Sequence, residues 1–249
     1  MRRYRSSEEF DGHFNYRSVI GKLNYLEKIT RPDISYAVHQ CARFSAAPKT
    51  EHSKALKWLG RYLIATRDKG LIFDPKEQSF DCHVDASFSG DWDREGALED
   101  IDTARSRTGF VISYANCPII WTSRLQTQIA LSSTESEYLA LSTALRDVIP
   151  LMGLVREMKA HGFDCQATHP KVHCRTFEDN SGAIQIATVH KSRPRTKHIN
   201  VAYHHFRSFI NSGDISVHDI DTTMQRADIF TKPVNETLIQ RHRLSIMGW

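Results

Sequence analysis

The stretch Ser132-Ser133-Thr134-Glu135-Ser136-Glu137-Tyr138 begins the longest helix that the sequence predicts, over residues 133–161, with a kink expected at Pro150. The apolar stripe of this helix consists of Leu141, Leu145, Val148, Met152 and Val155, spaced three or four residues apart. Glu137 lies on the same stripe, whereas Glu135 lies about 200° around the helix and can form a capping box with Ser132. A carboxylate on a buried face is costly unless a positive charge meets it. We therefore expect Glu137 to bind a metal ion and Glu135 to cap the helix.

The hydrophobic period changes from helical to alternating near residue 79, which predicts a sheet around this helix. Strands are expected at 79–84, 108–114, 118–123, 172–177 and 215–220, with a hairpin turn at Ala115-Asn116 and an extended segment at 128–131. Further helices are expected at 181–189, 199–211, 224–230 and 236–246. This order predicts an α/β fold with a mixed five-stranded sheet flanked by helices.

The first third of the chain is predicted to be helical, because its apolar residues recur at helical spacing. Helices are expected at 16–26, at 30–44 with Pro32 in the first turn, and from a cap at Thr50 to about residue 70. A strand at 71–73 and a turn at 74–77 follow. We place a boundary there, between a small helical segment at 1–76 and an α/β domain at 77–249.

Composition narrows the class of protein. The 249 residues are 40% hydrophobic and 25% charged, which is typical of a soluble globular protein. No run of 18 apolar residues predicts a membrane span, and the basic start is followed by acidic residues, which argues against a signal peptide. Residues 1–76 hold 15 Lys and Arg against 8 Asp and Glu, an excess that suits a phosphate backbone or simply a solvated basic surface.

Cysteine and histidine usage favours a reducing compartment without a zinc site. The five cysteines are odd in number and form no CxxC pair. His198, His204 and His205 lack cysteine partners at zinc spacing, so we interpret them as helix-surface histidines. We expect the protein to be intracellular, either cytoplasmic or nuclear.

Four acidic residues stand at strand ends or on helix flanks: Asp85, Glu137, Asp179 and Asp228. Each has a plainer explanation. Asp85 could open a turn, Asp179 could cap a helix in competition with Glu178 and Asn180, and Asp228 could pair with Arg226 or Lys232 at the surface. Four converging carboxylates, however, repel one another unless cations lie between them, and two Mg²⁺ ions are the usual solution.

Several motifs give the chain a family resemblance. Residues 79–233 resemble the ribonuclease H domain at the end of the Ty1/copia-type retrotransposon Pol polyprotein, through the segments 131–141, 178–183, 196–200 and 227–233. The segments 16–26, 30–34 and 61–66 are similar to the thumb or connection region that joins reverse transcriptase to ribonuclease H. The resemblance covers nearly the whole chain.

The resemblance implies an endonuclease that cleaves the RNA strand of an RNA–DNA hybrid, with the reverse transcriptase portion of the polyprotein as a partner. Asp85, Glu137, Asp179 and Asp228 would bind two Mg²⁺ ions, with Mn²⁺ as an alternative. Recognition would rest on phosphates and 2′-hydroxyls, with the basic residues of one loop as candidate backbone contacts. These residues are Lys191, Arg193, Arg195 and Lys197.

The chain departs from the family pattern at three points. The segment 91–107 is longer than usual and acidic, and the loop 221–226 lacks the histidine that cellular ribonucleases H use in product release. Nothing resembles the paired aspartates of a polymerase, an integrase or a protease, so polymerisation is not expected.

Two other functions compete with an active ribonuclease H. The chain could be a catalytically silent remnant that acts only as a nucleic-acid-binding or structural module. It could also be a DNA-cutting transposase or integrase, although such enzymes show the order Asp, Asp, Glu.

Overall fold

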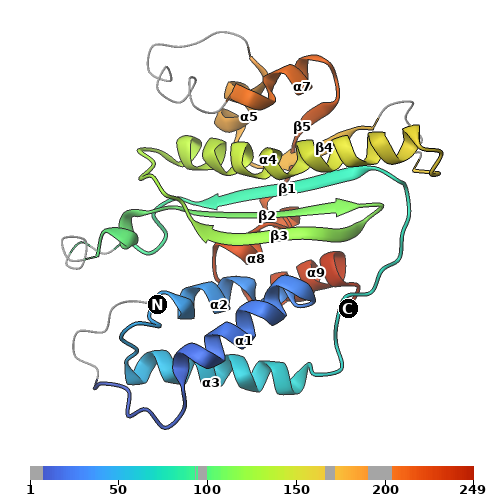
Figure 1. The fold of residues 1–249 in the computed structure, drawn as a ribbon. Helices are drawn as coiled ribbons and strands as arrows, with labels where there is room; N and C mark the ends of the chain where they lie inside the picture. Colours follow the sequence, from blue (N-terminus) through green and yellow to red (C-terminus); the bar gives the residue numbers. More distant parts are fainter. Residues whose placement is uncertain (1–7, 93, 95–99, 166–171, 190–203) are drawn as a thin grey trace.

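A five-stranded sheet lies at the centre of the computed structural model, which describes residues 8–92, 94, 100–165, 172–189 and 204–249 (Figure 1). The strands are β1 (Phe80–Ser87), β2 (Arg107–Tyr114), β3 (Cys117–Leu125), β4 (Cys174–Glu178) and β5 (Ile215–Asp219). Their spatial order is β3-β2-β1-β4-β5, antiparallel across the first three strands and parallel from β1 through β4 to β5. The mixed five-stranded sheet flanked by helices is therefore confirmed.

Local sequence explains this topology. The β2–β3 hairpin turns at Ala115 and Asn116, which both have positive φ angles (52° and 67°), as the tightest hairpin turns require. Parallel pairing of β1 with β4 instead needs a long crossover, which the helix α4 (Ser133–Ala160) provides.

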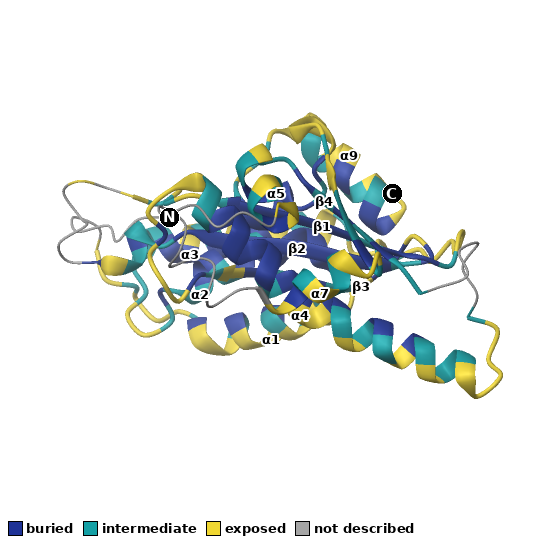
Figure 2. Ribbon diagram, turned by 90° about the horizontal axis from the view of Figure 1, so that it is seen from above, coloured by how far each residue is buried: buried dark blue, intermediate teal, exposed yellow. Residues whose placement is uncertain are grey.

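Helices cover both faces of the sheet. On one face lie α4, α5 (Ser181–Thr188) and α7 (Arg207–Asn211), and on the other lie α8 (Asp228–Thr231) and α9 (Glu236–Met247) (Figure 1). The apolar stripe of α4 packs on β1 and β2, and Leu141, Leu145 and Val148 are fully buried there with Phe80 and Phe110. Figure 2 shows this continuous buried band between exposed outer surfaces.

α4 is also the one described helix that is long and apolar enough to cross a membrane. Its apolar residues face the sheet, and 56% of the relevant window is buried inside the protein. This burial is that of a core helix.

Three N-terminal helices form a further layer below α8 and α9: α1 (Tyr16–Ile29), α2 (Ser35–Ala42) and α3 (Thr50–Ala65) (Figure 1). They enclose a hydrophobic cluster of their own, which includes Ile20, Leu23, Val38, Leu56 and Leu59. This separate cluster is compatible with the boundary near residue 76, which stays a proposal.

Several predicted elements have different bounds or are absent. The segment 71–73 is not a strand, because its backbone meets the end of α9 instead of a sheet edge: the Ile72 amide donates to the Met247 carbonyl at 3.0 Å. The segment 128–131 is likewise not extended into β3, and α3 begins at Thr50 with Lys49 as its N-cap residue and ends at Ala65. The predicted helix at 224–230 is split, since a 3-10 turn ends at Met224 and α8 begins only at Asp228.

Candidate active site

Asp85 lies near the C-terminal end of β1, as the sequence predicted, two residues before the last residue of the strand, Ser87. Its side chain is 2% exposed and lies beside α8. The Thr231 hydroxyl donates a hydrogen bond to Asp85 Oδ2, and the Lys232 ammonium lies 3.8 Å from the same oxygen. The carboxylate is therefore held from the α8 side.

Glu137 and Glu135 take the two positions that the helical stripe predicted. Glu137 is 6% exposed on the sheet-facing side of α4. Glu135 instead caps the helix: its amide donates to Ser132 Oγ at 3.1 Å, and its Oε2 accepts the Leu131 amide at 2.8 Å. The return hydrogen bond thus reaches one residue further back than in a standard capping box.

Asp179 follows the last residue of β4, and its neighbours take the other roles available there. Asn180 is the N-cap of α5, since its Oδ1 accepts the Ala183 amide at 3.0 Å. Glu178, the final residue of β4, is completely buried. Asp179 therefore does not cap the helix, and its carboxylate can join the other acids.

Asp228 is buried and not at the surface, although the expected ion pair is present: Lys232 Nζ lies 2.8 Å from its Oδ1. Two residues fix the helix that carries it. Gln225 Nε2 donates to the Val84 carbonyl at 2.8 Å and to the Phe177 carbonyl at 3.3 Å, which ties the preceding loop to β1 and β4. Ser123 Oγ donates to the Phe230 carbonyl at 2.6 Å, which ties α8 to β3.

Gly109 allows α8 to lie this close to the sheet. It pairs with Asp85 across β1 and β2. A Cβ atom at this position would lie 2.5 Å from Thr231 Cγ2 and 2.7 Å from Phe230 Cβ, closer than side chains pack. A side chain at position 109 would therefore push Asp228 away from Asp85.

These elements bring all four predicted carboxylates together, with Glu178 as a fifth. Ligand atoms of Asp85, Asp179 and Asp228 lie within 4.8 Å of one another, and so do those of Glu137, Glu178 and Asp179. Each triad can hold one ion, and Asp179 belongs to both. Carboxylate oxygens are the ligands that Mg²⁺ and Mn²⁺ prefer, and the buried Oε2 atoms of Glu137 and Glu178 have no hydrogen-bond partner. The residues therefore fit a pair of hard divalent cations.

The electrostatics of the cluster point the same way. Burial raises the pKa of Glu137 well above its usual range, and the neighbouring carboxylates of Glu178 and Asp85 raise it further. Burial, followed by the Asp85 charge, raises the pKa of Asp228 to about 7. Burial is also the main cause of the raised pKa values of Asp85 and Glu178. Bound cations would favour the ionised forms of all these groups.

Sequence reasoning missed the supporting residues Gly109, Gln225 and Thr231, it named Lys232 only as a surface partner of Asp228, and it left Glu178 as a competitor of Asp179. The Thr-Lys pair that follows Asp228 was the available signal, since Lys232 lies one helical turn after it. The candidate nucleic-acid contacts Lys191, Arg193, Arg195 and Lys197 lie outside the described residues.

No family model matches the chain. This chain is 34% identical over 219 residues to the retrovirus-related Pol polyprotein from transposon TNT 1-94 of Nicotiana tabacum. The aligned residues make up 88% of this chain and 15% of that protein. This chain is also 34% identical over 227 residues to the Pol polyprotein from transposon RE1 of Arabidopsis thaliana, which covers 90% of this chain and 14% of that protein.

A solved ribonuclease H1 isolated from compost shares 14% identity with this chain, at a TM-score of 0.42 over 66% of this chain and 97% of its own length. The chain itself spans about one seventh of the two polyproteins. The sequence identity to these two relatives extends over parts of both the N-terminal helices and the five-stranded sheet with its helices. The chain belongs to the family of Ty1/copia-type retrotransposon Pol polyproteins.

Proposed function

We propose that this chain is a ribonuclease H-type endonuclease that hydrolyses the RNA strand of RNA–DNA hybrids. Asp85, Glu137, Asp179 and Asp228 would be its catalytic and metal-binding residues. The observation that carries the proposal is the pair of carboxylate triads that share Asp179 in a buried cluster. Membership of a retrotransposon Pol family supports the choice of substrate.

The carboxylates would hold two Mg²⁺ or Mn²⁺ ions, which would supply activation of a water molecule and charge stabilisation at the leaving 3′ oxygen. Asp85, Asp179 and Asp228 would hold one ion, and Glu137, Glu178 and Asp179 the other. The protein's own contribution is positioning: Thr231 and Lys232 fix Asp85 and Asp228, and Gln225 fixes the loop between β5 and α8.

Substrate binding would be largely independent of sequence, because an RNA–DNA hybrid is recognised by its shape, its phosphates and its 2′-hydroxyls. Lys191, Arg193, Arg195 and Lys197 remain the proposed backbone contacts. We further propose that the reverse transcriptase portion of the polyprotein is a partner, and that the protein acts inside the cell, in the cytoplasm or nucleus.

The test is cleavage of an RNA–DNA hybrid labelled on each strand, with Mg²⁺ present. The native chain is compared with Asp85→Asn and Glu137→Gln, and with Glu157→Gln as a matched control, because Glu157 is exposed on the same helix as Glu137. We expect the native chain and the Glu157 variant to cut only the RNA strand, and the other two to be inactive.

Equal cleavage by all four proteins, or none by any, would refute the proposal. Hybrid binding without cleavage by the native chain would instead support a silent binding module. Cleavage of duplex DNA would favour a transposase-like enzyme.

A further inference from the structure

A polar pocket of about 90 Å³ adjoins the carboxylate cluster and shares Thr231 and Lys232 with it. By volume it has room for several water molecules or one small ion. Its other walls come from distant parts of the chain: Tyr36 and Gln40 of α2, and Arg107 at the start of β2. The N-terminal helices and the sheet domain therefore build this pocket together.

Arg107 is the unusual member of the pocket. The residue is only 3% exposed, and its Nη2 atom is buried without a hydrogen-bond partner. Its remaining contacts are weak: Nη1 donates to Ser123 Oγ at 3.3 Å, and the guanidinium lies 5.3 Å from the Tyr36 ring centre. Burial lowers the pKa of Arg107, which reflects the cost of keeping a charge there. A buried guanidinium without a carboxylate partner is a strongly unfavourable arrangement unless an anion compensates it.

The one carboxylate among the residues that line the pocket, Asp91, favours the charge of Arg107 from a distance but forms its ion pair with another residue. Asp91 Oδ2 lies 2.6 Å from Arg43 Nη1 and 3.0 Å from Gln40 Nε2, so its charge is already engaged by α2 and the residue after it. Arg105 also lines the pocket. Its Nη1 atom pairs with Asp102 Oδ1 at 2.9 Å, whereas its Nε atom is buried without a partner. Lys232 is paired with Asp85 and Asp228, so Arg107 is the cation of the pocket that has no ion pair, and two guanidinium N–H groups are left without an acceptor.

We propose that this pocket binds a backbone phosphate of the RNA strand, beside the phosphate that is cleaved. A guanidinium presents paired N–H donors that match phosphate oxygens, which makes arginine the preferred residue for this contact. The strand assignment follows from Thr231, which lines the pocket and also donates to Asp85. A phosphate in the pocket is thus a close neighbour of one at the carboxylates, and close neighbours lie on one strand. This inference rests on the proposed function.

The inference also gives the N-terminal helices a role in substrate binding, since α2 supplies Tyr36 and Gln40 and holds Asp91 in place. Without α2, Arg107 would lose its ring contact and would be open to solvent on that side. The pocket is then a subsite that exists only when both parts of the chain are present.

The experiment measures binding of a short RNA–DNA hybrid in Ca²⁺, so that it does not depend on cleavage. The native chain is compared with Arg107→Gln and with Arg156→Gln, a control about 28 Å along α4 from Glu137. We expect Arg107→Gln to weaken binding about tenfold or more and to reduce the slope of log Kd against log salt by about one. Arg156→Gln should change neither quantity.

Single neutral methylphosphonates, introduced at each RNA and DNA phosphate in turn, then locate the contact. One RNA position should weaken binding to the native chain but have no further effect on the Arg107→Gln variant. Arg107→Lys, which keeps a charge in the pocket, should bind with intermediate affinity and depend on the same phosphate, and it serves if the Gln variant does not fold.

Equal binding by native and Arg107→Gln chains, or identical methylphosphonate effects in both, would overturn the inference. Coupling to a DNA phosphate would overturn the strand assignment. If the native chain binds the hybrid and the effect of one RNA methylphosphonate depends on Arg107, but the hybrid is not cut, the proposed catalysis is wrong and the subsite is supported. If the native chain cuts the hybrid but no methylphosphonate effect depends on Arg107, the subsite alone is wrong. If the native chain does not bind the hybrid, both proposals are wrong.

Discussion

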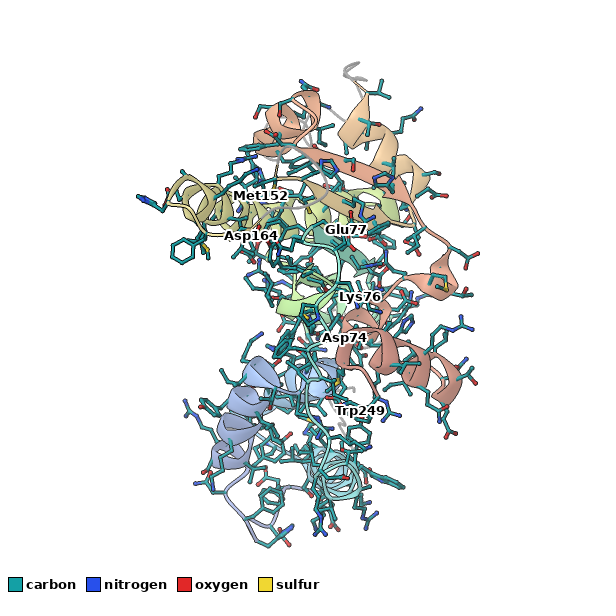
Figure 3. All side chains as sticks on the ribbon, turned by 90° about the vertical axis from the view of Figure 1, so that its right-hand side faces the viewer. Asp74, Lys76, Glu77, Met152, Asp164 and Trp249 are labelled. Atoms are coloured by element: carbon teal, nitrogen blue, oxygen red, sulfur yellow. The ribbon has the colours of Figure 1, made fainter. Side chains whose placement is uncertain are left out.

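Two groups of interacting side chains lie wholly or partly buried in the structure, and the charges within them are balanced in opposite ways. One group, the junction cluster, consists of Arg31, Asp33, Tyr62, Arg243 and Trp249. The other, the carboxylate cluster, consists of Asp85, Glu137, Glu178, Asp179 and Asp228. The junction cluster connects the N-terminal helices to the end of the chain, where Figure 3 labels Trp249.

The junction cluster satisfies its own charges. Arg31 donates to both carboxylate oxygens of Asp33, at 2.9 and 2.8 Å, and the Tyr62 hydroxyl donates to Asp33 at 2.5 Å. Arg243 donates to the same hydroxyl at 3.0 Å and lies 4.6 Å from the Trp249 ring centre. Arg31 and Asp33 neutralise each other, and the half-buried Arg243 guanidinium lies against the Tyr62 and Trp249 rings, although its Nε atom has no hydrogen-bond partner.

The carboxylate cluster does not satisfy its charges. Within the described part of the chain, Lys232 is the cation that pairs with it, and it faces Asp85 and Asp228. Glu137 and Glu178 are left with raised pKa values, chiefly because of burial. Buried charge alone therefore does not indicate a binding site. A binding site is indicated where the buried charges lack opposite charges to balance them.

The contrast between the two clusters is tested most strongly by removal of one carboxylate from each. Asp85→Asn should lower the rate of RNA cleavage by more than about 100-fold, since even the loss of outer-shell groups around a metal costs 10–100-fold. The same change should raise the melting temperature of the metal-free protein at pH 8, because it removes a repulsive charge. Asp33→Asn should instead lower the melting temperature. Two shifts of the same sign, or a lowered melting temperature for Asp85→Asn together with a raised one for Asp33→Asn, would contradict the comparison.

Removal of Arg31, the ion-pair partner of Asp33, should change the stability of the protein and not its cleavage activity. Arg31→Ala leaves Asp33 buried without its ion pair, which costs about 3–5 kcal/mol of unfolding free energy. Urea denaturation measures this loss, with Lys22→Ala, an exposed position on α1, as the control that should change little. A loss below about 1 kcal/mol would show that the cluster is not what joins the two parts.

A substitution at Gly109 tests the position of Asp228 relative to Asp85 without changing the charge of the carboxylate cluster. Gly109→Ala should cost about 1–3 kcal/mol through overpacking against Thr231 and Phe230, and it should reduce cleavage by moving Asp228. The control is Gly153→Ala in α4, where the new methyl group meets nothing within 4 Å. That variant should gain about 0.5–1 kcal/mol and keep its activity. Full activity in Gly109→Ala would mean that α8 need not approach the strand so closely.

The smallest expected effect is the pH dependence of the metal-free protein. The folded-state pKa of Asp228, about 7, lies above its unfolded value near 3.8, so the folded state binds more protons between these values. The stability that this group contributes is therefore present below about pH 4 and is lost as pH rises through 7. We expect the melting temperature to fall by a few degrees from pH 5 to pH 8, and Mg²⁺ to restore it more at pH 8. A melting temperature that rises over this range without metal would contradict the assignment.

Much of the fold could be predicted from the sequence, because local patterns determine it. The α4 stripe separated Glu137 from Glu135, and Ala115-Asn116 marked the hairpin turn. The segment 71–73 was misassigned, since its partner lies in α9, nearly 180 residues later in the chain. Gly109, Gln225 and Arg107 were missed for the same reason: each acts through contacts with distant segments, which no local pattern records.

The central claim is that five carboxylates, four of them buried and Asp179 half-buried, are balanced by two cations that share Asp179. The most direct measurement is anomalous scattering from crystals of the native chain grown with Mn²⁺. The claim predicts two peaks, one among Asp85, Asp179 and Asp228 and one among Glu137, Glu178 and Asp179. No peak at either triad, under conditions in which Mn²⁺ binds elsewhere on the protein, would contradict it.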